Sequence, residues 1–154
     1  MMIRYKTIEH NVIGDAPFIG ARISSINCPF NCPGCFNQHL KKIPTKKLSG
    51  EQIIKLVKFN IFNQGLILAG LEWTDQPLEM YALIEEALHE GLEVILYTHH
   101  SEEEFKNKFR LYPIYIKFGA YDQENKNIGN KKSLGVTLAS NNQYIKDFRE
   151  EKFL

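Results

Sequence analysis

Short apolar runs alternate with segments of helical periodicity along most of this chain. Runs at 65–69, 92–97 and 114–118 are continuous enough for strands buried on both faces, and the segments between them repeat apolar residues at helical spacing. Such alternation with right-handed crossovers predicts an α/β fold with a mostly parallel sheet. A closed eight-unit barrel needs about 250 residues, and the chain has 154. We therefore expect a single domain over 1–154 with an open, partial (βα) barrel.

Capping residues place the helices between these strands. Ser49 with Gln52 and Ser101 with Glu104 are capping boxes, which predict helix starts at 49 and 101, the second helix running to about residue 110. Asp75, two residues before a proline, is expected to cap the helix between them, and a glycine at 91 to end that helix. The expected apolar face of the first helix comprises Ile53, Ile54, Leu56, Val57 and Ile61.

The composition limits the class of protein. Hydrophobic residues make up 44% and charged residues 24%, which predicts a globular chain. The formal charge of +1 does not favour binding to nucleic acid or to a membrane surface. The sequence has no apolar run of the roughly 20 residues that a membrane span requires. Clustered thiols without a recognisable signal peptide predict a cytoplasmic, reducing location.

All three cysteines of the chain lie within eight residues, as Cys28, Cys32 and Cys35 in a C-x3-C-x2-C loop. Three thiolates can hold three irons of a 4Fe–4S cluster, whereas a structural cluster normally takes four. The fourth iron would then be open to a substrate or cofactor. The alternative is a closed zinc site that includes His39, although structural zinc usually takes two separated ligand pairs. A disulfide would leave an odd thiol.

The residues around this loop resemble those of a known superfamily. A C-x3-C-x2-C motif followed by an aromatic residue, here Phe36, resembles the cluster signature of radical S-adenosylmethionine enzymes, and the string at 32–37 (CPGCFN) resembles the activating proteins of anaerobic ribonucleotide reductases. The segments 66–77, 94–98, 115–127 and 140–143 resemble further motifs of these activases in the same order. The resemblance covers about 20–145. It implies that Cys28, Cys32 and Cys35 bind a 4Fe–4S cluster whose fourth iron is chelated by S-adenosylmethionine.

The resemblance also implies residues that bind the cofactor, which are Phe36, Asn37, Gly70, Leu71, Glu72, Ser140 and Asn142. Gly70, Leu71 and Glu72 match a Gly-Gly-Glu turn that meets the methionine amine, except that Leu71 replaces the second glycine. If that turn needs a positive φ, Leu71 is strained, and Leu71→Gly would not weaken cofactor binding. Sequence alone leaves Glu72 open to being a plain exposed carboxylate. His99 and His100 follow the predicted strand at 92–97, and we assign them no role. Trp73 and Tyr121 are expected to be ordinary packing residues.

The function that the resemblance implies is an enzyme that makes a radical on another protein. One electron from the cluster would cleave S-adenosylmethionine to a 5′-deoxyadenosyl radical, and this would generate a glycyl radical on an anaerobic ribonucleotide reductase. A flavodoxin- or ferredoxin-type protein would donate the electron. Two alternatives stay open, a radical enzyme acting on a small molecule, as the deazapurine synthases do, and a non-enzymatic interaction module that carries zinc or an iron–sulfur cluster.

Overall fold

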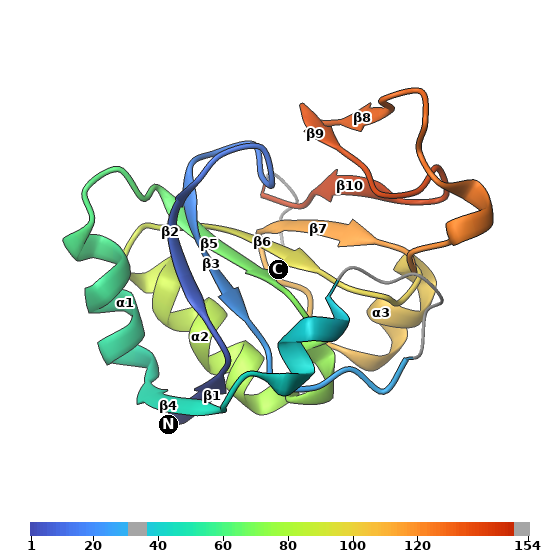
Figure 1. Cartoon of the computed structure of the whole chain (residues 1–154). Coiled ribbons are helices and arrows are strands. Elements are labelled where there is room, and N and C mark those ends of the chain that lie inside the picture. Colours follow the sequence, from blue (N-terminus) through green and yellow to red (C-terminus); the bar gives the residue numbers. More distant parts are fainter. Residues whose placement is uncertain (31–36, 150–154) are drawn as a thin grey trace.

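The computed structural model describes residues 1–30 and 37–149 and is built on a six-stranded sheet (Figure 1). The strand order is β10-β7-β6-β5-β3-β2. The central strands β3, β5, β6 and β7 pair in parallel, and the edge strands β2 and β10 are antiparallel to their neighbours. The strands of this sheet are β2 (Ile8–Val12), β3 (Gly20–Ser24), β5 (Gly65–Ala69), β6 (Glu93–Tyr97), β7 (Tyr115–Phe118) and β10 (Tyr144–Asp147).

Two smaller pairs of strands flank the sheet. One joins β1 (Met2–Tyr5) to β4 (Lys46–Ser49), and the other is the hairpin of β8 (Lys132–Ser133) and β9 (Val136–Thr137). The hairpin lies on the side of the sheet opposite the helices (Figure 1). Short 3₁₀ turns occupy Gln38–Lys42, Trp73–Asp75 and Gln123–Asn125. The assignment of this sheet to an open, partial barrel, and of 1–154 to one domain, stays a prediction.

Three helices cover one face of the sheet, α1 (Gly50–Phe59), α2 (Pro77–His89) and α3 (Glu102–Lys108) (Figure 1). Both predicted capping boxes are confirmed, because Ser49 and Ser101 exchange side-chain and backbone hydrogen bonds with the residues three positions on. No helix in the described part of the chain is long and apolar enough to cross a membrane.

Two details of the predicted helices are wrong. Leu56 and Ile61 are 45% and 83% exposed, because Leu56 points away from the sheet and α1 ends before Ile61. Asp75 does not cap α2, since it belongs to a 3₁₀ turn and the helix begins after Gln76. The Gln76 side chain instead accepts from the Ile26 backbone N–H and donates to a β1 carbonyl, which ties the helix start to β1 and to the segment after β3.

The two faces of the sheet build two hydrophobic layers because successive strand residues point to opposite sides. In β5, Leu66 and Leu68 pack under the helices, whereas Ile67 and Ala69 face the opposite layer. The helix-side layer also holds Trp73, whose indole N–H donates to a β3 carbonyl, so the expected packing role of this residue is confirmed. The second layer is roofed by side chains from the hairpin and from the β2–β3 loop. This roofed face holds the site.

Candidate functional site

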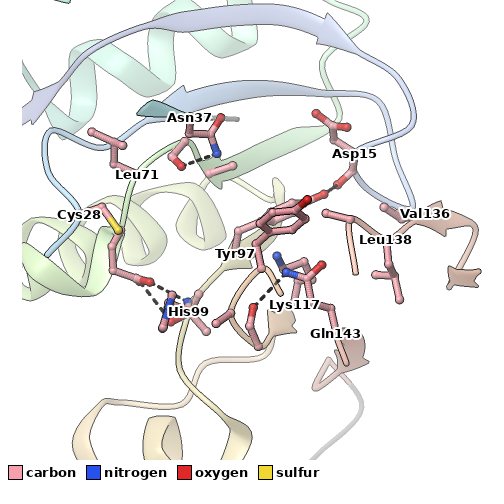
Figure 2. A pocket seen from close by; sticks show the side chains of 18 of the residues that line it. Asp15, Cys28, Asn37, Leu71, Tyr97, His99, Lys117, Val136, Leu138 and Gln143 are labelled. Carbon is pink, nitrogen blue, oxygen red and sulfur yellow. Dashed lines mark hydrogen bonds between the residues drawn. The ribbon is translucent and has the colours of Figure 1, made fainter. Parts of the chain in front are cut away.

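A cavity of about 270 Å³ opens at the carboxyl ends of the parallel strands, on the face beneath the hairpin (Figure 2). Its volume is close to the lower end of the roughly 300–1,000 Å³ of small-molecule sites. Residues that follow three successive strands line it, among them Cys28 after β3, Gly70, Leu71 and Glu72 after β5, and Thr98 and His99 after β6. Ligands in parallel sheets gather at this edge. These three segments therefore converge on one cavity.

Of the three cysteines expected to bind a cluster, Cys28 is the one within the described residues, and it lies at one end of this cavity (Figure 2). The thiol is half-buried, with Sγ 3.7 Å from the Phe30 carbonyl oxygen. Cys32, Cys35 and Phe36, predicted as ligands and cofactor contact, lie outside the described residues. A thiol facing a cavity is the donor that an iron–sulfur cluster requires, so Cys28 fits the expected 4Fe–4S cluster.

Asn37 fastens the end of the cysteine segment to the turn after β5. Its side-chain amide donates to the Gly70 carbonyl oxygen over 2.8 Å. Gly70 has φ of +90°, and a Cβ at this position would lie 2.6 Å from Cβ of Ser24 on β3. Only glycine therefore fits here. The structure gives Asn37 a physical task that its sequence context did not reveal.

Leu71 lines the cavity without backbone strain. Within the described residues, the non-glycine positions with positive φ are Asn11, Asn130 and Leu134, and Leu71 is not among them. The expectation that Leu71→Gly would not weaken cofactor binding depended on a positive φ at Leu71, and this condition is not met. Leu71 is 8% exposed, so its side chain forms part of the cavity wall.

Glu72 is a buried carboxylate, 2% exposed, and not the plain surface carboxylate that the sequence left open. Its Oε2 accepts from the Thr74 hydroxyl over 2.8 Å, the Thr74 backbone N–H over 3.3 Å and the Thr98 hydroxyl over 3.1 Å. Its Oε1 accepts from the His99 backbone N–H over 2.7 Å. These bonds offset the cost of burying the charge. Glu72 thus joins the turn after β5 to the turn after β6.

The opposite end of the cavity carries polar residues that the sequence analysis missed. Arg22 on β3 pairs with Asp15 of the β2–β3 loop over 3.1 Å. The Tyr97 hydroxyl donates to the Asp15 carbonyl, and burial raises the pKa of this phenol well above its ordinary value. The ammonium of Lys117 lies 4.8 Å from the centre of the Tyr97 ring. Tyr97 lies at the end of the predicted strand at 92–97, where site residues are expected. No sequence motif indicated Asp15.

Ser140 and Asn142, which the resemblance implied as cofactor contacts, do not line this cavity, whereas the neighbouring Gln143 does. Ser140 is fully buried and its hydroxyl accepts from the Asp122 backbone N–H. Asn142 donates to the Ala120 carbonyl over 2.8 Å. Gln143 donates to the Gly119 carbonyl over 3.1 Å. The segment therefore shapes the cavity wall after β7 from behind, with Gln143 as its contact residue.

Residues 20–146 of the chain match the family described as the 4Fe-4S single cluster domain. The chain belongs to this family. The match spans the cysteine loop, the four parallel strands and most of β10, which is most of the chain. No curated protein matches the chain at a significant level. The family membership favours an iron–sulfur cluster over zinc at the cysteine loop, so this 4Fe-4S single cluster domain is an iron–sulfur protein compatible with redox chemistry.

Proposed function

We propose that this 4Fe-4S single cluster domain is a radical S-adenosylmethionine activase that generates a glycyl radical on an anaerobic ribonucleotide reductase. The observation that carries the proposal is the convergence of Cys28, from a loop with three cysteines and no fourth in the chain, with the Gly70–Glu72 turn on one cavity. When bound, the cluster supplies one electron, and S-adenosylmethionine supplies the adenosyl group that removes a hydrogen atom from a partner glycine.

The turn after β5 is the proposed contact for the methionine part of the cofactor. Gly70 lets the backbone pass close to Ser24, and Leu71 presents backbone groups and an apolar side chain to the cavity. Asn37 and Glu72 hold this turn from both sides through the bonds to Gly70 and His99. Phe36 is proposed as the adenine contact, from the resemblance. Ser140 and Asn142 serve in this proposal by supporting the wall after β7 rather than by touching the cofactor.

The partner assignment rests on the resemblance of 32–37 and 140–143 to reductase-activating proteins. In this proposal the cofactor end lies beside Cys28, and the glycine of the reductase approaches from the end where Asp15, Arg22 and Tyr97 lie. The electron comes from a flavodoxin- or ferredoxin-type protein. The proposed location is the cytoplasm, where thiols stay reduced.

The test is anaerobic incubation of the cluster-loaded protein with reductant, S-adenosylmethionine and the reductase. We expect about four irons and four sulfides per chain, methionine and 5′-deoxyadenosine as products, and a glycyl radical by electron paramagnetic resonance. One zinc without sulfide would refute the radical chemistry and support a metal-bearing interaction module. Cofactor cleavage without a protein radical would refute the reductase as substrate.

A second candidate is a radical enzyme that acts on a small molecule. The ion pair of Arg22 and Asp15 favours it, since a charged pair beside an apolar wall is the kind of group that orients a polar small ligand. Turnover of a pterin-type precursor of deazapurines, with no radical formed on the reductase, would establish this candidate.

A further inference from the structure

The ring of His99 stacks on the ring of Phe30. The two centroids lie 3.6 Å apart and the planes differ by 2°, so the rings are parallel and in full contact. Phe30 belongs to the cysteine loop, two residues after Cys28 and two before Cys32. His99 belongs to the turn after β6 and lines the cavity at the same end as Cys28 (Figure 2).

The turn that carries His99 is itself held firmly. The His99 backbone N–H donates to the buried Glu72 carboxylate. The next residue, His100, lies edge-on to Phe30 at 5.7 Å, and its Nε2 is 3.1 Å from the Thr74 hydroxyl. That hydroxyl in turn donates to Glu72. The platform under Phe30 is therefore anchored to the turn after β5.

We infer that His99 is a positioning residue that seats the cysteine loop for cluster binding by stacking on Phe30. The contact uses the face of the imidazole ring, so the inference assigns the positioning task to the ring face and not to the ring nitrogens. A flat aromatic ring on a fixed turn restricts where Phe30 lies, two residues after Cys28. The inference deepens the proposed function and rests on it only for the cluster, not for cofactor cleavage.

The test compares His99→Ala, which removes the ring, with His99→Phe, which keeps a stacking face and removes both nitrogens. Each protein is reconstituted anaerobically, its iron and sulfide are counted, and the loss of cluster absorbance in air is timed. We expect cluster loss roughly two- to tenfold faster in His99→Ala, the range set by one aromatic pair, and a rate near wild type in His99→Phe. His89→Ala, an exposed histidine at the end of α2, is the matched control and should leave the rate unchanged.

A second variant keeps the inference falsifiable if His99→Ala folds poorly. Phe30→Ala should speed cluster loss at least as much as His99→Ala, because it removes the same stacked contact and the edge contact with His100. The double variant should be no worse than Phe30→Ala alone, because the stacked contact can be lost only once. Additive effects, a wild-type rate in His99→Ala, or equal damage from His99→Phe and His99→Ala would each overturn the inference. A protein that keeps its iron but never cleaves S-adenosylmethionine would refute the proposed function and leave this inference standing.

Discussion

Replacing Glu72 tests whether the floor of the cavity depends on one buried carboxylate. Four donors converge on Glu72, and two of them are the backbone N–H groups of Thr74 and His99, which cannot turn away. A buried donor left without an acceptor costs about 1–3 kcal/mol. Glu72→Ala should therefore lower the free energy of unfolding by about 2–6 kcal/mol, a large part of the roughly 5–15 kcal/mol of a typical domain.

Glu72→Gln refines this prediction because the amide keeps one acceptor. The side-chain oxygen can still serve one group of donors, whereas the –NH₂ faces the other as a second donor. We expect a loss of about 1–3 kcal/mol, from one unsatisfied position. The matched control is Glu51→Ala on α1, whose exposed ion pair with Lys55 spans 3.7 Å. That change should stay within about 0.5 kcal/mol.

Urea unfolding of the metal-free protein, followed by far-ultraviolet circular dichroism, measures these differences. Binding of S-adenosylmethionine to the cluster-loaded variants then reports on the turns that Glu72 joins. The reasoning would be refuted if Glu72→Ala lost less than about 1 kcal/mol, since two backbone donors would then have found other partners. A loss equal in Glu72→Ala and Glu51→Ala would refute it as well.

Three further predictions follow from the same structure. Leu71→Gly should destabilise the protein by about 1.5–3 kcal/mol through lost burial and weaken binding of S-adenosylmethionine in a titration; unchanged binding would place this side chain outside the cofactor site. Cys28→Ala should abolish cofactor cleavage, with a corresponding loss of iron, while His39→Ala keeps the cluster; loss of all metal in His39→Ala would favour zinc. A hydrogen bond from Lys146 and further bonds lower the pKa of Glu102 to about 2, against about 4.3 in an unfolded chain. This carboxylate should thus add about 1 kcal/mol to the free energy of unfolding above pH ~4.3, and this contribution is lost as the pH falls towards 2. Unfolding curves in which Glu102→Gln loses as much stability in acid as the wild type would contradict this.

Local signals in the sequence predicted much of the framework. The capping boxes at Ser49 and Ser101 depend on residues three positions apart, so the chain itself contains all that they need. The strand at Gly65–Ala69 was predicted to the residue, because a short apolar run before a glycine leaves little freedom. The same local reasoning went wrong at Asp75, because Gln76 instead bonds to β1 and to the segment after β3, both distant in the sequence, and the helix starts after it.

The sequence by itself determined that three thiols lie close together in one loop and which edge of the sheet this loop leads to. Three thiols at that spacing, and turns that follow parallel strands, are properties of the chain order. Only the tertiary structure decided that Glu72 is buried, that His99 lies against Phe30 and that Asp15 faces Arg22. Each of these contacts joins loops or strands whose mutual distance depends on how the sheet packs, and no local pattern encodes that distance.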